Sequence, residues 1–130
     1  MIAVLDASAA VRTVMEPDST FRAALAEADL VIAPELIVAE VCSAFRKYVR
    51  ARMLSRSAAE QSIEKALALV DKLQPLRELV PEVLELAART DNSVYDLFYL
   101  SLARRTGATL LTADRALQKA AAAMRIDAPL

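Results

Sequence analysis

Residues 93–114, SVYDLFYLSLARRTGATLLTAD, contain the two kinds of element that decide the fold. Ser93 followed three residues later by Asp96 is the pattern of a helix start, and the mostly apolar residues after it predict a helix. Gly107, the only glycine of the chain, separates this helix from the short apolar run 109–111, which has the character of a buried strand. A helix that leads directly into a buried strand is typical of parallel sheets.

Two further apolar runs have the same character as residues 109–111. They cover residues 2–5 and 30–33, and each is short and bounded by polar or turn-forming residues. Residues 73–80 and 125–128 are weaker candidates for additional strands. The chain therefore predicts a sheet of four or five strands.

The segments between these runs have the periodicity of helices. Apolar residues recur three and four positions apart over residues 36–45 and again over 63–73. Helix starts are indicated by Pro34, by the capping-box pattern of residues 57–60 and by Pro81. Strands that alternate with helices predict a three-layer α/β/α fold with a central, mostly parallel sheet, formed as a single domain by residues 1–130.

The composition excludes several classes of active site. One glycine in 130 residues is too few for a P-loop or a dinucleotide-binding fingerprint. The absence of histidine and the single cysteine, Cys42, exclude disulfides, thiolate zinc sites and imidazole catalysis, and we expect Cys42 to be a small buried apolar residue. A metal ion would therefore have to be held by oxygen atoms.

Charge and hydropathy indicate where the protein works. No run of 18 residues is free of charge and the N-terminus has no basic flank, so we expect a cytoplasmic protein without a membrane partner. Sixteen basic and seventeen acidic residues give a net charge of −1, which by itself neither favours nor excludes nucleic acid.

Four acids are predicted to meet at one edge of the sheet. Asp6 follows the first strand and Asp114 follows the strand at residues 109–111, so both lie at the carboxyl ends of parallel strands. Glu40 lies on the apolar face of the helix after the second strand, and Asp96 lies in the first turn of a helix that starts at the same edge. Ligands of open α/β sheets bind at this carboxyl edge.

Each of these acids also has a purely structural explanation. Asp6 and Asp114 could cap helices, Asp96 could belong to a capping box, and Glu40 could be a satisfied buried acid or reflect a different helix register. Taken together, however, two carboxylates about 4 Å apart repel by about 4 kcal/mol at an effective dielectric constant of 20, which favours binding of a cation. Oxygen ligands favour Mg²⁺ or Mn²⁺, and phosphodiester hydrolysis is the natural chemistry of such a site.

Two hydroxyl groups and a basic strip accompany the acids. Ser8 and Thr112 could orient a ligand carboxylate or a water, although helix capping explains them equally well. Arg46, Lys47 and Arg50 belong to a segment without acids and could contact RNA phosphates, or they could simply face the negative end of a helix dipole.

The aromatic side chains after Asp96 lie at helical spacing. Tyr95, Phe98 and Tyr99 are expected to pack in the core or at a dimer interface rather than to stack on bases.

At these residues the sequence resembles PIN-domain proteins, and more narrowly VapC-like toxins of bacterial toxin-antitoxin pairs. The matching segments are AVLDASA, PELIVAEVCSAFRK, NSVYDLFYLSLARR and LLTADRAL, in the order and spacing of the family. The resemblance implies a metal-dependent endoribonuclease that is usually a homodimer and is neutralised by a small antitoxin. It also implies that Asp6, Glu40 and Asp96 are core metal ligands, whereas the fourth acid, here Asp114, varies in position in the family.

Two other functions remain open from the sequence. An aspartyl-phosphate phosphatase or phosphoacceptor domain also places an acid after its first strand, but the phosphatase pattern has a second Asp where this chain has Ser8. A non-catalytic module that binds RNA or a protein partner could retain the same fold.

Overall fold

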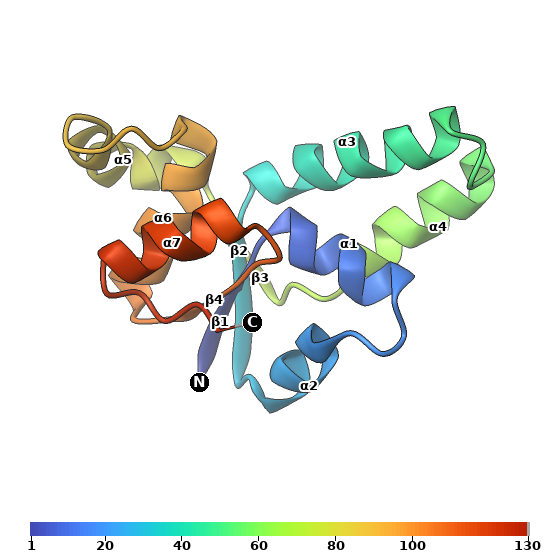
Figure 1. The fold of residues 1–130 in the computed structure, drawn as a ribbon, viewed down its shortest axis with the longest axis horizontal. Helices are drawn as coiled ribbons and strands as arrows, with labels where there is room; N and C mark the ends of the chain where they lie inside the picture. The colour runs from blue at the N-terminus through green and yellow to red at the C-terminus, as the bar shows by residue number, and fades with distance from the viewer. Residues whose placement is uncertain (130) are drawn as a thin grey trace.

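The computed structural model describes residues 1–129 and is built around a parallel sheet of four strands (Figure 1). The strands lie in the order β3-β2-β1-β4. Their bounds are Ile2–Leu5 for β1, Leu30–Pro34 for β2, Lys72–Gln74 for β3 and Thr109–Leu111 for β4. The central pair β1 and β2 aligns Ala3 with Val31, and β4 lies on the other side of β1. The predicted mostly parallel sheet is confirmed.

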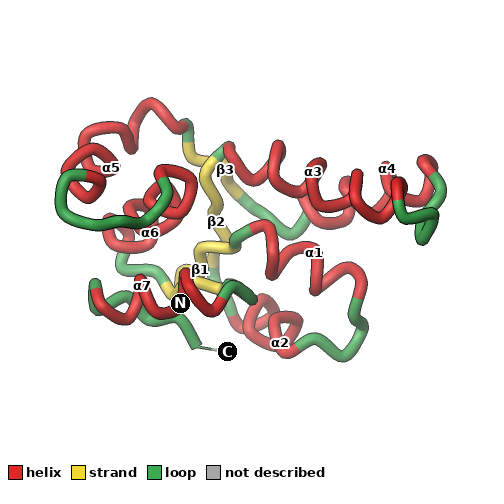
Figure 2. Tube along the Cα trace, turned by 45° about the horizontal axis from the view of Figure 1, so that its top comes forward, coloured by secondary structure: helices red, strands yellow, loops and turns green. Residues whose placement is uncertain are grey.

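Helices cover both faces of the sheet, which confirms the three-layer α/β/α fold. One face carries α1 (Ala7–Met15), α2 (Thr20–Glu27), α3 (Leu36–Arg50) and α4 (Arg56–Leu67). The other carries the 3₁₀ helix η1 (Leu76–Leu79) with α5 (Val80–Ala87), α6 (Val94–Thr106) and α7 (Arg115–Ala123). Figure 2 shows the strands as a column between these two groups of helices.

Alternate residues of the central strands explain the two cores. Val4 and Ile32 belong to the cluster under α5, α6 and α7, whereas Ala3 and Val31 belong to the cluster under α1 to α4. Both clusters consist of apolar side chains that are almost fully buried. Strands buried on both faces are continuously apolar, which is why the runs at residues 2–5 and 30–33 could be recognised.

The helix α6 begins and ends as the sequence predicts. The Ser93 hydroxyl accepts a hydrogen bond from the backbone N–H of Asp96 at 3.1 Å and caps the helix. At the other end Gly107 adopts φ 65°, the left-handed conformation that glycine tolerates best, and closes the helix before β4. This geometry carries the chain directly from α6 into the sheet.

The weaker strand predictions need correction. Residues 73–80 contribute to β3, which ends at Gln74, and Pro75 then leads into η1. Residues 125–128 form no strand. The backbone turns at Arg125, which has φ 59°, and the segment shares one backbone hydrogen bond with β4, from Leu110 N–H to Asp127 O. One such bond does not make a ladder, so the sheet has four strands within residues 1–129.

Three local predictions in the α3–α4 region are wrong. The cap of α4 is Ser55, whose hydroxyl accepts from Ala58 N–H at 3.1 Å, and the predicted capping-box residue Ser57 already lies inside the helix. Helix α4 ends at Leu67, so the apolar periodicity predicted over residues 63–73 includes part of β3. Cys42 is exposed and does not belong to the core.

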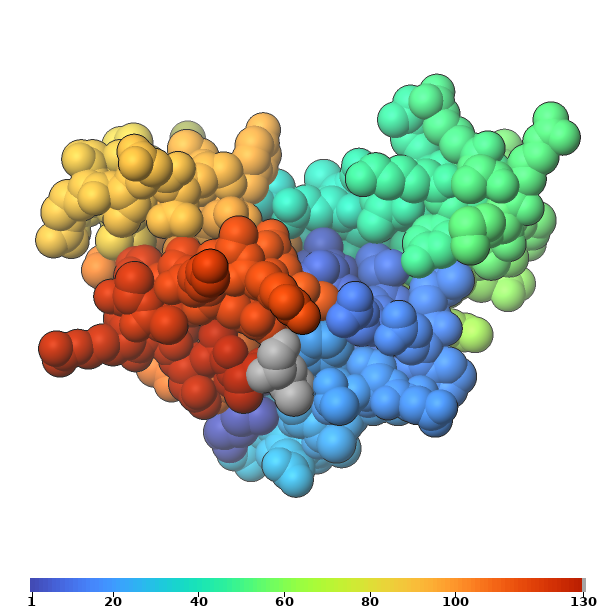
Figure 3. All heavy atoms as spheres, in the orientation of Figure 1, coloured from blue at the N-terminus to red at the C-terminus, as the bar shows by residue number. Residues whose placement is uncertain are grey.

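The arrangement leaves one edge of the sheet surrounded by helix starts. The carboxyl ends of the strands point upward in Figure 1, and α1, α3, α6 and α7 begin on that side. The pair α3 and α4 extends from the body of the molecule as an arm, and the surface is hollowed between this arm and the α5–α6 side (Figure 3). Among the described residues no helix is long and apolar enough to span a membrane.

Candidate active site

Asp6 is the most deeply buried of the four predicted acids, at 5 % exposure. It follows β1 and caps α1, because its Oδ1 accepts a hydrogen bond from Ala9 N–H at 2.9 Å. The Ser8 hydroxyl donates to the same oxygen at 2.7 Å, and the Thr112 hydroxyl donates to Oδ2. Burial, with a smaller contribution from the charge of Glu40, raises the pKa of Asp6 to about 6 against the opposing effect of these hydrogen bonds.

The two predicted hydroxyl residues join β1 to β4 around this carboxylate. Ser8 Oγ accepts from Ala113 N–H at 2.9 Å, and Thr112 Oγ1 accepts from Asp114 N–H at 3.0 Å. The two hydroxyl oxygens lie 3.3 Å apart. Both side chains therefore stabilise the turn after β4 and also hold Asp6 by hydrogen bonds, and their role in orienting a metal ligand stays a prediction.

Glu40 occupies a half-buried position on α3 and is held by an aromatic hydroxyl from the opposite side of the sheet. The phenol of Tyr99, on α6, donates a hydrogen bond of 2.6 Å to Glu40 Oε1. Burial raises the pKa of Glu40, the Tyr99 hydrogen bond lowers it, and the negative charge of Asp96 raises it again. The predicted helix register is correct, because Ile37 and Val41 beside Glu40 are fully buried.

Asp96 and Asp114 occupy the starts of two helices on the solvent side of the site. Asp96 lies half-buried in the first turn of α6, and its pKa is raised first by burial and then by the charge of Asp114. Asp114 is exposed and caps α7, accepting from Ala116 N–H at 2.9 Å and Leu117 N–H at 3.3 Å. The helix-cap explanation thus holds for Asp6 and Asp114, and it is compatible with a second role for both.

Each of three of these acids has its pKa raised by the negative charge of the next one. Glu40 raises the pKa of Asp6, Asp96 raises that of Glu40, and Asp114 raises that of Asp96. Across residues 1–129 none of the four carboxylates forms an ion pair with a lysine or arginine. A group of anions without a cation of its own is suited to receive one.

The donor set fits a hard divalent ion. All available ligand atoms are carboxylate or hydroxyl oxygens, which Mg²⁺ and Mn²⁺ prefer. In the part of the chain that is described, no three acid, histidine or cysteine side chains gather tightly enough to enclose an ion. Mg²⁺ keeps several waters and needs few direct carboxylate ligands, which suits such an open arrangement.

Tyr99 is the site residue whose role the sequence did not reveal. Its side chain is almost fully buried, as expected for packing, but its hydroxyl also holds Glu40. Burial, and then the hydrogen bond to Glu40 and the charges of Glu40 and Asp6, raise the pKa of this hydroxyl. The available signal was its position three residues after Asp96, which puts both side chains on one face of α6. Phe98 packs against the core as expected, whereas Tyr95 is 61 % exposed and lies outside it.

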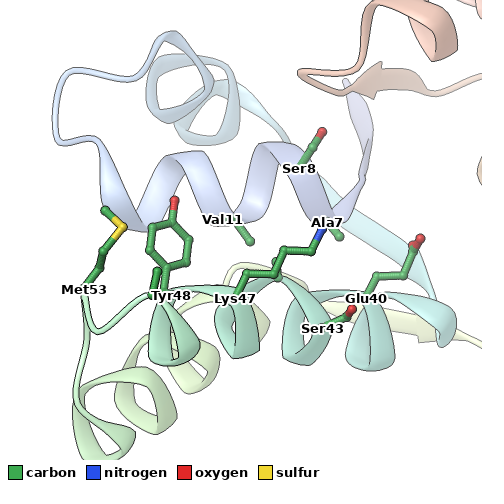
Figure 4. A pocket seen from close by; sticks show the side chains of 10 residues that line it. Ala7, Ser8, Val11, Glu40, Ser43, Lys47, Tyr48 and Met53 are labelled. Atoms are coloured by element: carbon green, nitrogen blue, oxygen red, sulfur yellow. The ribbon is translucent and has the colours of Figure 1, made fainter.

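A pocket of about 630 Å³ opens beside the acids, between α1 and α3 (Figure 4). Ser8 and Glu40 lie at its acid end, and Lys47 is also part of its lining. Of the three basic residues predicted to contact RNA, Lys47 is thus brought beside the site, whereas Arg46 and Arg50 are exposed on α3 outside the pocket lining.

Comparison with known proteins identifies the family. The PIN domain family model matches residues 3–123, and the chain therefore belongs to the PIN domain family. No curated protein matches the chain. Among solved structures, PAE2754 from Pyrobaculum aerophilum is 26 % identical, with 92 % of this chain and 86 % of that chain covered and a TM-score of 0.71.

Two further solved structures share the fold. VapC20 of Mycobacterium tuberculosis, described as a sarcin-ricin loop cleaving toxin, is 16 % identical, with 91 % of this chain and 94 % of that chain covered and a TM-score of 0.64. VapBC2 of Rickettsia felis, bound to a DNA fragment from its promoter, is 15 % identical, with 88 % of each chain covered and a TM-score of 0.60.

Proposed function

We propose that this protein is a metal-dependent endoribonuclease that hydrolyses RNA phosphodiester bonds, and that it is the toxin of a bacterial type II toxin-antitoxin pair. The observation that carries the proposal is the chain of four mutually repelling carboxylates, none of them ion-paired within residues 1–129, at the carboxyl edge of a PIN-domain sheet. The likeness of the fold to a toxin described as cleaving the sarcin-ricin loop supports RNA as the substrate.

The proposed ligands are Asp6, Glu40, Asp96 and Asp114, and the proposed ion is Mg²⁺ or Mn²⁺. When bound, such an ion supplies charge stabilisation at the phosphate and lowers the pKa of a water, so that no histidine base is needed. Metal affinity then depends on pH, because an ion must displace the proton that burial favours on Asp6.

The residues of the chain have distinct tasks in this proposal. Asp6 is the rigid inner ligand, since Ser8 and Thr112 both donate hydrogen bonds to it. Tyr99 keeps the Glu40 carboxylate in place. Asp96 and Asp114 lie at the more accessible side and would complete the site from the side on which the RNA backbone approaches.

The partners are also part of the proposal. A small antitoxin protein would neutralise the toxin, in line with the similarity to VapBC2, whose name describes a two-component complex. The resemblance to VapC-like toxins implies a homodimer, and the pattern of charge and hydropathy favours the cytoplasm.

The phosphoacceptor alternative is disfavoured by the surroundings of Asp6. Both carboxylate oxygens accept hydrogen bonds from Ser8, Ala9 or Thr112, and the side chain is 5 % exposed. The position at which the phosphatase pattern has its second Asp is occupied by Ser8, whose hydroxyl donates a hydrogen bond to Asp6. A non-catalytic module would bind RNA or a protein partner without cleaving RNA, so a cleavage assay separates it from a nuclease.

The test is cleavage of total bacterial RNA, with new ends mapped by sequencing. Wild-type protein with Mn²⁺ is expected to produce defined new ends, and EDTA is expected to stop the reaction. Asp96→Asn should lower the rate about 100-fold or more, as loss of a metal-site group does. Asp91→Asn, an identical change at an exposed site just before α6, should leave cleavage unchanged. Cleavage that resists EDTA or survives Asp96→Asn would contradict the proposal.

A further inference from the structure

The pocket between α1 and α3 has two chemically different ends. One end is shared with the acids, through Ser8 and Glu40. The other is mostly apolar and is formed by Val11, Tyr48 and Met53. Its volume of about 630 Å³ lies in the range of pockets that hold small organic groups. Whatever occupies the apolar end therefore lies next to the group that reacts at the acids.

Lys47 lies between these two ends. Figure 4 shows its side chain running from α3 toward α1, with the ammonium group near Ala7 and on the side of the pocket nearer to Glu40. Within residues 1–129 the ammonium group of Lys47 forms no ion pair and no hydrogen bond. An unpaired cation beside an apolar wall and close to a proposed phosphodiesterase site is complementary to a phosphate group that flanks the reacting one.

The basic character continues beyond the pocket along the same helix. Residues 41–59 contain no acid, and Arg46, Arg50 and Arg52 lie exposed around the end of α3. A polyanion that leaves the acid site along α3 would therefore meet positive charge. This charge distribution favours a nucleic acid as the occupant over an apolar segment of a protein.

Tyr48 gives the apolar end a flat wall. Its ring packs on Phe45 with centroids 5.7 Å apart and an interplanar angle of 34°, which fixes its orientation. Met53, 67 % exposed, lies beside it at the mouth of the pocket. Within the described chain the Tyr48 hydroxyl forms no hydrogen bond. A nucleobase stacks on aromatic side chains, and a methionine adapts to whatever lies against it.

We propose that this pocket binds one unpaired nucleotide of the RNA substrate that flanks the cleaved phosphodiester. Its base packs against Tyr48 and Met53, and its phosphate meets Lys47. The inference rests on the proposed function and adds a nucleotide-binding subsite beside the acids, which a base can enter only when it is unpaired.

The test measures RNA binding in EDTA, so that its outcome does not depend on cleavage. The probe is a fluorescein-labelled pool of random single-stranded RNA of about 12 nucleotides, a length typical of single-strand binding sites, and the readout is fluorescence anisotropy. The variants are Lys47→Met, which keeps the apolar stem of the side chain, and Tyr48→Leu. The control is Lys65→Met, an identical change at an exposed position of α4 outside the pocket.

Lys47→Met is expected to weaken binding and to reduce the slope of log affinity against log salt by about one phosphate contact. Tyr48→Leu is expected to weaken binding about fivefold or more, as loss of one stacked base does, and to reduce the preference for single strands over the same RNA annealed to its complement. Met53→Ala provides a second test of the apolar wall, because an exposed side chain can be removed without loss of folding. Lys65→Met should behave as wild type.

Three results would overturn the inference. They are absence of RNA binding by the wild type, wild-type binding by the Lys47, Tyr48 and Met53 variants, and equal binding of single-stranded and annealed RNA. If the variants bound RNA as the wild type does, the occupant of the pocket would be a protein segment and not RNA. Failure of the proposed function gives a different result. If the protein bound RNA through this pocket but did not cleave it, the nucleotide-binding pocket would stand and the nuclease activity would be ruled out.

Discussion

Replacement of Asp6 by asparagine is expected to make the metal-free protein more stable at neutral pH. The Asp6 carboxylate is 5 % exposed and has a pKa of about 6, against an ordinary value of 3.8. Each unit of difference corresponds to about 1.4 kcal/mol, so the ionised form costs the folded state about 3 kcal/mol at pH 7.5. Asparagine resembles the protonated acid and does not incur this cost.

The hydrogen bonds of the site can survive the change. The amide oxygen can accept from Ala9 N–H as Oδ1 does now, and the amide NH₂ can donate to the Thr112 hydroxyl. Asparagine also caps helices about as well as aspartate. For a domain of this size we expect a melting temperature about 10 °C higher at pH 7.5 in EDTA.

The pH dependence gives the prediction its sign. A raised acid pKa destabilises the folded state only where the group would be ionised in the unfolded chain, so the cost is absent below about pH 4 and complete above about pH 6. The difference in melting temperature between Asp6→Asn and wild type should therefore grow across this window. Asp18→Asn, in the exposed turn before α2, should show no such growth. If Asp6→Asn were less stable than wild type at pH 7.5, the ionised Asp6 carboxylate would not be destabilising the folded state.

Two further substitutions test the site and the fold. Tyr99→Phe removes the hydrogen-bond donor that favours ionised Glu40, so the pKa of Glu40 should rise. The acidic limb of the pH–rate profile for RNA cleavage should then move to higher pH. An unmoved limb would show that the Tyr99 hydroxyl does not position Glu40. Gly107→Ala should lower the free energy of unfolding, measured in urea, by about 1 kcal/mol. The loss comes from backbone strain at φ 65°, because a Cβ at this position would meet no atom within 4 Å. Gly107→Asn should lower the free energy of unfolding less. Equal stability of Gly107→Ala and wild type would contradict the left-handed helix end.

Local patterns predicted those parts of the fold in which sequence and position are directly linked. The strands at residues 2–5 and 109–111 have the predicted bounds, because a strand buried on both faces must be apolar throughout. Parallel topology then places Asp6 and Asp114 at one edge without any knowledge of packing. The Ser93 cap and Gly107 follow from the chemistry of helix ends alone.

The features that were missed depend on contacts between distant segments. Glu40 and Tyr99 are 59 residues apart, and their hydrogen bond depends on how α3 and α6 pack around the sheet. The exposure of Cys42 depends on which neighbour covers each face of α3. Both Ser55 and Ser57 are residues that commonly cap helices. The path of the backbone determines that Ser55 is the cap of α4.

The most direct test of the central claim, that the four acids share a divalent cation, is calorimetric titration of Mn²⁺ into metal-free protein at pH 7.5. We expect saturable binding by the wild type, binding at least about tenfold weaker for Asp96→Asn, and wild-type binding for Asp18→Asn. Absence of Mn²⁺ binding by the wild type, or equal binding by all three proteins, would contradict a shared cation site.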